Sequence, residues 1–295
     1  MKKRRKLIEK IIEKGLLMVA VMTVAITVLI VFILFSQTFQ FFREVSIVEF
    51  FTSTKWTPTL VPKHFGILPL VTGTLMIAVG SSLLSLPIGL GSAIYLSEYA
   101  NPTVRKIVKP MLELLAGVPS IVYGFFALTT ITPFLQSILP GTEVFNAASA
   151  SIAVGIMTIP MVASLSEDAM MAVPDSIRKG AYALGATKFE VATKVIIPAT
   201  ISSIASAFVL AISRAIGETM IVSIAAGQNP VLALNPLQSI QTMTGFMVNL
   251  SLGDIQQGTT EFRTIFAVGA LLFLMTLVMN IVSRFIVKKF QEVYQ

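Results

Sequence analysis

An arginine and a glutamate lie four residues apart in a strongly apolar stretch of this sequence. Arg214 and Glu218 stand near the middle of AFVLAISRAIGETMIVSIAA. On a continuous helix this spacing places both side chains on one face. A charged side chain at the centre of a membrane helix costs roughly 2.5 to 3.5 kcal/mol on insertion scales, so the pair is expected to face a polar cavity. The alternative is that the two charges only neutralise each other at a helix interface.

The chemistry that this pair predicts is recognition of an anion. An arginine keeps its charge in a low-dielectric setting, and its planar fork suits a tetrahedral oxyanion bidentately. Glu218 would hold that fork in place while the site is empty. Thr219 and Ser213 add hydroxyl groups nearby, although such hydroxyls in membrane helices often bond their own backbone.

A second polar pair lies in the stretch AGVPSIVYGFF. Ser120 and Tyr123 stand three residues apart behind Pro119. They could line the same path as Arg214. A packing kink with an interfacial tyrosine explains them equally well.

A polar, cationic segment between two apolar stretches is the best indication of a partner. It runs from Lys179 to Pro198 and reads KGAYALGATKFEVATKVIIP. Gly185 interrupts two short helical patterns, and an aliphatic run then stops at Pro198, which predicts a loop followed by re-entry into lipid. A membrane protein has no need of such a segment for its own helix packing.

Several kinds of catalysis are not expected from this composition. The chain contains no Cys and a single His, His64, which lies beside Lys63 and is expected to be a solvated loop residue. Disulfides, thiolate nucleophiles and cysteine zinc sites are therefore impossible. The chain also has no Gly-Lys-Ser or Gly-Lys-Thr phosphate loop, so ATP hydrolysis by that mechanism would need a partner. We expect no enzyme activity, no metal and no cofactor on this chain.

The elements that position these residues are predicted to be membrane helices. Of 295 residues, 55% are hydrophobic and 13% are charged, and the mean hydropathy is +0.83, which is typical of a polytopic all-α membrane protein. Crossing a hydrocarbon core of about 30 Å takes about 20 helical residues. Six stretches are long and apolar enough: Gly15–Phe35, Ile67–Leu96, Ile107–Ile131, Val144–Leu165, Ala199–Ala226 and Thr264–Val287.

The positive charges predict the orientation of these helices. With both termini in the cytoplasm, 17 of the 22 Lys and Arg residues lie in cytoplasmic segments, which satisfies the positive-inside rule. The net charge of +7 is therefore explained by topology, and no nucleic-acid partner is expected. The outer segments hold four cations: Arg43, Lys55, Lys63 and Arg263.

The chain is expected to be one membrane protein in two parts. Residues 1–66 would hold the basic N-terminus, the first helix and an outer segment, in which Ser46–Trp56 is predicted to be a short helix in the headgroup region. Residues 67–295 would form the transmembrane domain, with a cytoplasmic segment at about 167–198. No cleavage site follows the first apolar stretch, which is expected to remain as a helix. Glycines and prolines in the second, third and fourth stretches could kink helices that line a cavity, or they could be ordinary packing features, which is the favoured interpretation for each single residue.

The motifs together resemble a known family. The spacing of Gly185 and Pro198 resembles the cytoplasmic coupling motif of bacterial ABC importer permeases. That motif begins with Glu-Ala-Ala. In this chain Lys179, Gly180 and Ala181 occupy those positions, so the first residues differ from the family consensus. Three further segments resemble permease subunits of the phosphate (Pst) ABC importer: SEDAMMAVPDSIRKGAYALGATKFEVATKVIIPA, ELLAGVPSIVYGFFAL and SRAIGETM. The resemblance extends from about Gly66 to the C-terminus. GETM followed by IVSIAAG is more similar to the PstC type than to the PstA type.

The resemblance implies a fold, a role and partners. The fold would be the type I importer fold, an extra first helix plus five core helices, in the bacterial cytoplasmic membrane. The partners would be a second homologous PstA-like permease, two PstB-like ATPases that bind ATP and Mg, a PstS-like phosphate-binding protein, inorganic phosphate and lipid. Phosphate would pass a cavity containing Arg214 and Glu218. The residues implied for ATPase coupling are Lys179, Gly180, Ala181, Leu184, Gly185 and Ala186.

Three other functions remain open from the sequence. A permease for sulfate, molybdate or another oxyanion is the nearest, and competition between anions would decide it. A secondary transporter or channel would need no docking segment and would not co-purify with an ATPase. A membrane hydrolase would need a nucleophile and a base within the membrane, and neither is apparent.

Overall fold

Six helices are long and apolar enough to cross a membrane in the computed structural model, which describes residues 2–291. No strand occurs in that range, where the one bridge pairs Trp56 with Phe65. The prediction of an all-α, multi-pass membrane protein is confirmed. The six candidate spans are Glu9–Glu44, Leu68–Tyr99, Ser120–Ile138, Ala147–Met171, Lys188–Ile216 and Thr260–Phe285.

The described chain contains thirteen α-helices and three π-helical segments. Its first half comprises α1 (Lys2–Glu44), α2 (Ile47–Thr52), α3 (Leu68–Ile94), η1 (Tyr95–Tyr99), α4 (Pro102–Ala116), α5 (Ser120–Phe126), η2 (Ala127–Ile131) and α6 (Thr132–Ile138). The second half comprises α7 (Ala147–Met171), α8 (Asp175–Ala183), α9 (Lys188–Glu190), η3 (Val191–Ile196), α10 (Ile197–Ile216), α11 (Met220–Ala225), α12 (Met243–Leu252) and α13 (Thr260–Gln291).

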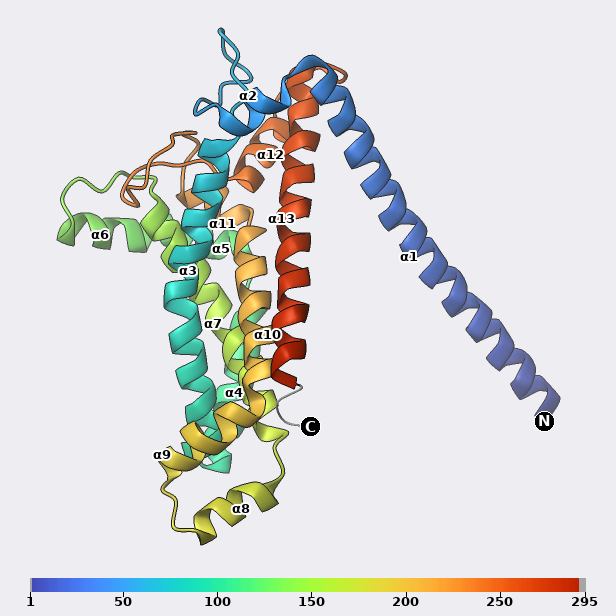
Figure 1. The fold of residues 1–295 in the computed structure, drawn as a ribbon, viewed down its shortest axis with the longest axis vertical. Helices are drawn as coiled ribbons and strands as arrows, with labels where there is room; N and C mark the ends of the chain where they lie inside the picture. Colours follow the sequence, from blue (N-terminus) through green and yellow to red (C-terminus); the bar gives the residue numbers. More distant parts are fainter. Residues whose placement is uncertain (1, 292–295) are drawn as a thin grey trace.

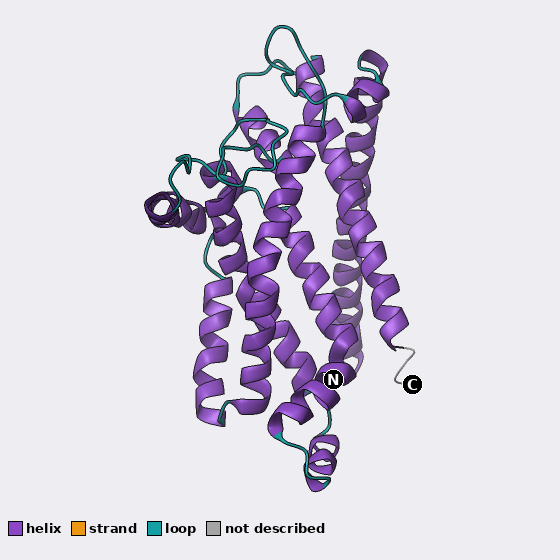
Figure 2. Cartoon of the chain, turned by 60° about the vertical axis from the view of Figure 1, so that its left-hand side comes forward, coloured by secondary structure: helices purple, strands orange, loops and turns teal. Residues whose placement is uncertain are grey.

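The long helices α3, α7, α10 and α13 form the body of the bundle (Figures 1 and 2). Glycines let α3 and α7 approach closely. A Cβ at Gly89 would lie 2.6 Å from the Val162 side chain, and one at Gly155 would lie 2.8 Å from the Leu84 side chain. The interpretation of these glycines as packing positions is confirmed, because a larger residue would force the two helices apart.

Helix α1 projects away from the bundle (Figure 1). It meets the rest of the chain at one end, where the Thr38 hydroxyl donates to the Phe266 carbonyl of α13 at 3.0 Å. Its most apolar 18-residue window is entirely unburied within this chain. Exposure of such a large apolar surface to water is unfavourable, so lipid or another membrane subunit must cover α1.

Two predicted spans are interrupted in the structure. The stretch 107–131 is divided between α4 and α5, since Gly117 caps α4 and Pro119, which has no N–H to donate, precedes α5. The stretch 199–226 is divided between α10 and α11, and Gly217 ends α10. The prediction of one continuous helix in each stretch is wrong.

The outer segment differs from the prediction as well. Helix α2 ends at Thr52, and Trp56 is not exposed at a membrane surface, because it is only 2% exposed. The Trp56 ring packs edge-on against Phe246 of α12, with 5.0 Å between the ring centroids. The tryptophan therefore ties the segment after α2 to α12 as part of an aromatic core.

Shorter helices lie at the two ends of the bundle. Helices α8 and α9 lie at one end, and α2 and α12 lie toward the other (Figure 1). The N-terminal end of α1 lies toward the end that carries α8.

Candidate functional site

Arg214 lies in the last turn of α10, and its side chain is exposed on the surface of this chain. Its guanidinium contacts the sulfur of Met157 on α7, with 3.9 Å between Nη2 and Sδ. Within residues 2–291 no carboxylate lies within ion-pair distance of Arg214. A helix C-terminus favours a cation, but the fork of this arginine remains available to a ligand.

Glu218 does not pair with Arg214, contrary to the prediction. The helix ends between them at Gly217, so the two side chains no longer share a helical face. Glu218 is 8% exposed, and its Oε1 accepts from the Ile221 N–H at 3.3 Å, while its carbonyl accepts from the Thr244 hydroxyl at 2.6 Å. Glu218 therefore joins α10, α11 and α12 and does not hold the guanidinium.

The other predicted path residues have local roles. The Thr219 hydroxyl donates to the Gly217 carbonyl at 3.1 Å. Tyr123 is 8% exposed, and its hydroxyl donates to the Leu115 carbonyl of α4 at 3.0 Å, across the break between α4 and α5. Ser120 is the half-buried first residue of α5.

One apolar cluster brings several of these positions together. Tyr123, Met157, Ala215, Ile216 and Ile221 are all buried in it. Four helices, α5, α7, α10 and α11, thus converge around the turn that carries Arg214. Arg214 therefore projects from a turn that is packed against four helices.

The predicted coupling segment forms a well-defined backbone turn. Gly185 follows α8 with φ +85°, the left-handed conformation that glycine adopts most readily. The N–H of Ala186 bonds to the Ala181 carbonyl at 3.2 Å, and that of Gly185 bonds to the Tyr182 carbonyl at 3.0 Å, which is a Schellman motif. Thr187 then starts α9 with a capping box.

The six predicted coupling residues divide into two groups. Ala181 and Ala186 are half-buried and pack against an apolar cluster of α3, α7 and α10 residues. The other group is exposed, and Leu184 is 91% exposed. Nearby Phe189 is 67% exposed. An apolar surface at this end of the molecule indicates a protein interface. The exposed group comprises Lys179, Gly180, Leu184 and Gly185.

Arg178, which the sequence analysis did not select, anchors this segment. Its guanidinium donates to the carbonyls of Met170 and Val173 at 2.6 and 2.5 Å and to the Glu98 carboxylate at 3.2 and 3.3 Å. The Glu98 side chain is only 3% exposed. Sequence offered little signal for this pair, because its members lie 80 residues apart.

A second ion network joins α4 to α7 at the same end of the bundle. Arg105 pairs with Glu167 at 2.5 Å, and Lys109 pairs with Glu167 at 2.8 Å and also with Asp168. The Glu167 side chain is 1% exposed. Removing one partner of a buried pair costs about 3 to 5 kcal/mol, so this network fixes the end of α4.

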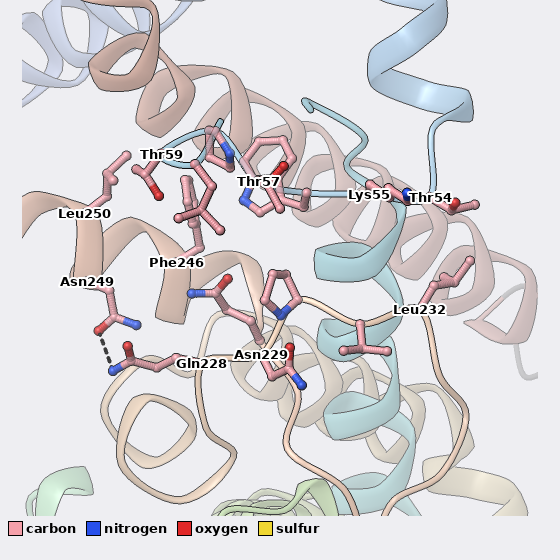
Figure 3. Close-up of a pocket in the computed structure, with 16 residues that line it drawn as sticks. Thr54, Lys55, Thr57, Thr59, Gln228, Asn229, Leu232, Phe246, Asn249 and Leu250 are labelled. Carbon is pink, nitrogen blue, oxygen red and sulfur yellow. Dashed lines mark hydrogen bonds between the residues drawn. The ribbon is translucent and has the colours of Figure 1, made fainter. Parts of the chain in front are cut away.

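A polar pocket of about 600 Å³ lies at the opposite end (Figure 3). It lies between the segment after α2, the loop that follows α11, and α12. Lys55 is the one charged residue in its lining, which also includes Thr57, Asn229 and Asn249. The Gln228 amide donates to the Asn249 side-chain oxygen at 3.4 Å. Sequence reasoning missed this pocket because three separate segments supply its walls.

The comparisons with known proteins identify the family. Residues 85–292 match the model of the binding-protein-dependent transport system inner membrane component. The chain belongs to that family. As a permease of this family, it has 34% identity over 82% of its length to a probable ABC transporter permease protein, YqgH, of Bacillus subtilis, covering 78% of that protein. It has 32% identity to the phosphate transport system permease protein PstC of Xylella fastidiosa, covering 80% of this chain and 78% of that protein.

Solved structures agree with this fold. A chain of a bacterial alginate ABC transporter, solved in complex with an alginate pentasaccharide-bound periplasmic protein, superposes with a TM-score of 0.61. The match covers 93% of this chain and 94% of that one at 16% identity. A chain of the MetNI methionine ABC transporter superposes with a TM-score of 0.57. That match covers 76% of this chain and 97% of the other at 16% identity. The predicted type I importer permease fold, with an extra first helix, is confirmed.

In this permease the two candidate regions lie apart. Arg214 emerges from the helix bundle, and the coupling segment lies beyond the end of that bundle. One region presents an exposed guanidinium, and the other presents an exposed apolar turn that includes Leu184.

Proposed function

We propose that this chain is a transmembrane subunit of an ATP-driven phosphate importer, which passes inorganic phosphate from an external binding protein to the cytoplasm. The observation that carries the proposal is Arg214, an exposed guanidinium at the end of a membrane helix with no carboxylate partner among the described residues. Relatives named as phosphate transport permeases at about 30% identity support the choice of solute.

Phosphate would be held briefly at Arg214. The guanidinium fork can donate two parallel hydrogen bonds to a tetrahedral oxyanion. A single arginine without further charged donors binds weakly, and conduction requires that a bound ion can leave. Thr219, Ser120 and Tyr123 remain candidates for lining the path, and Glu218 would position α11 beside it.

ATP would be hydrolysed by two partner ATPase subunits. The sequence lacks a phosphate loop of the Gly-Lys-Ser/Thr type, so ATP and Mg would bind to those partners. They would dock on Lys179, Gly180, Leu184 and Gly185, while Ala181 and Ala186 fix the segment to the bundle. Closure of the ATPase pair would then push on α8.

Two further proteins would complete the importer. A second, homologous permease of the PstA type would cover the exposed apolar surface of α1 and would enclose Arg214 between the two permeases. A phosphate-binding protein of the PstS type would dock at the outer end, over the polar pocket that contains Lys55 and Asn249.

Uptake of labelled phosphate by the reconstituted importer tests this function. We expect uptake to need ATP, the binding protein and this chain, and to be unaffected by excess sulfate or molybdate. Inhibition by either anion would favour the rival oxyanion permease. Uptake without any co-purifying ATPase would favour a secondary transporter.

The proposed orientation places both termini and Lys179 in the cytoplasm. Single cysteines can report it, because the chain has no native Cys. A cysteine at Lys179 should react with an impermeant maleimide only after the membrane is opened, and one at Gln257, in the loop before α13, should react in intact cells. Both positions are exposed. Protection of the Gln257 position in intact cells would contradict the model.

A further inference from the structure

We propose that the ion pair between Arg178 and Glu98 transmits displacement of the coupling helix α8 to α3. The inference rests on the proposed docking of an ATPase at α8 and assigns a positioning role to two residues that no comparison identifies. Neither residue would touch phosphate or nucleotide.

The connections of α8 give the reason. Its N-terminal end is joined by three residues to α7, and its C-terminal end is joined through the Gly185 turn to α9 and α10. The backbone therefore links α8 to α7 and α10 directly. It offers no such link to α3, whose continuation η1 ends at Tyr99.

The Arg178 guanidinium supplies that link. Two of its donors hold the end of α7 and the loop after it through the Met170 and Val173 carbonyls, and two more reach the Glu98 carboxylate of η1. Among the described residues, no other hydrogen bond or ion pair joins α8 to α3 or η1. A rotation of α8 must either carry Glu98 with it or break this pair.

The surroundings make the link stiff. The Arg178 and Glu98 side chains are 12% and 3% exposed, so solvent screens their attraction little. Ala93 of α3 and Met170 of α7 belong to the apolar cluster against which Ala181 of α8 packs. Packed side chains and ion pairs of this kind can carry coupling between distant parts of a protein.

Glu98→Ala in the complete importer tests the proposal. Arg178 keeps its two carbonyl contacts in this variant, so α8 stays in place and the ATPase should co-purify at the wild-type ratio. We expect stimulation of ATP hydrolysis by phosphate-loaded binding protein, and phosphate transported per ATP, to fall by at least about five-fold, the lower end of usual coupling between sites. Glu98→Gln, which keeps a polar contact without the charge, should have an intermediate effect.

Asp175→Asn is the matched control. It alters the other carboxylate near Arg178, at 3.5 Å, but that side chain is 79% exposed, so transport per ATP should be unchanged. Normal stimulation and transport by Glu98→Ala would overturn the relay while leaving the proposed function intact. Failure of both Glu98 variants to assemble would show a purely structural pair and would also overturn it. Failure of the wild-type chain to bind any ATPase would overturn the proposed function and the relay together.

Discussion

Arg214→Gln is expected to lower phosphate uptake by roughly ten- to a hundred-fold, since hydrogen bonds to charged groups contribute about 1.5 to 3 kcal/mol. The complex should still assemble, because the guanidinium is exposed and its contact with the Met157 sulfur, at 3.9 Å, is weak. Arg214→Lys should recover only part of the uptake, because an ammonium lacks the planar fork. The measurement is labelled phosphate uptake normalised to assembled complex.

Two further variants separate the anion contact from local packing. Met157→Leu removes the sulfur contact and preserves the volume, so it should transport normally. Adding Glu218→Gln to Arg214→Gln should not restore uptake, because Glu218 bonds to the α11 backbone and not to Arg214. Near-normal transport by Arg214→Gln itself would exclude the arginine as the phosphate contact.

Gly185→Glu should reduce binding of the ATPase by about ten-fold. The φ of +85° at Gly185 is a left-handed conformation that costs other residues roughly 1 to 2 kcal/mol. A Cβ at this position would meet no atom of this chain within 4 Å, and Gly185 is exposed, so membrane insertion and folding of the bundle should be preserved. The readout is the amount of ATPase recovered with the purified permease and its stimulation by the binding protein.

A graded series makes this result specific. Gly185→Asn should bind nearly normally, because asparagine tolerates the left-handed region, and Gly185→Ala should fall between the two. Gly180→Ala is a useful comparison, since Gly180 also has open space but an ordinary helical conformation. Unchanged coupling in Gly185→Glu would show that the ATPase docks elsewhere.

The fold was predictable from the sequence because lipid imposes a simple requirement. Each span must satisfy its backbone hydrogen bonds internally and be apolar over about 20 residues. Long apolar stretches in the sequence therefore identify the spans. Hydropathy does not register a change of helix direction within an apolar stretch. The break at Gly217 was therefore missed, and Gly117 and Pro119 were read as packing or kink positions within one helix although they end α4 and precede α5. The burial of Trp56 depends on α12, nearly two hundred residues away, and could not be read locally.

The candidate site was only partly predictable for the same reason. Arg214 and Gly185 were found because each violates a local rule, a charge in an apolar stretch and a glycine between two helical patterns. The supposed pairing of Arg214 with Glu218 assumed a helix that continues through Gly217. Arg178 and Glu98 violate no local rule. Their importance arises from tertiary contact.

The Gly185 turn has a further consequence for the rate and strength of assembly. Fixing the backbone of one residue costs roughly 1 to 2 kcal/mol in conformational entropy, and here the Schellman motif and the capping box at Thr187 have already fixed this stretch within the free chain. An ATPase that docks on Leu184 would meet a shaped surface and would not have to order a loop. Association should therefore be limited by encounter between the two proteins, with little of the binding free energy lost to folding of the turn.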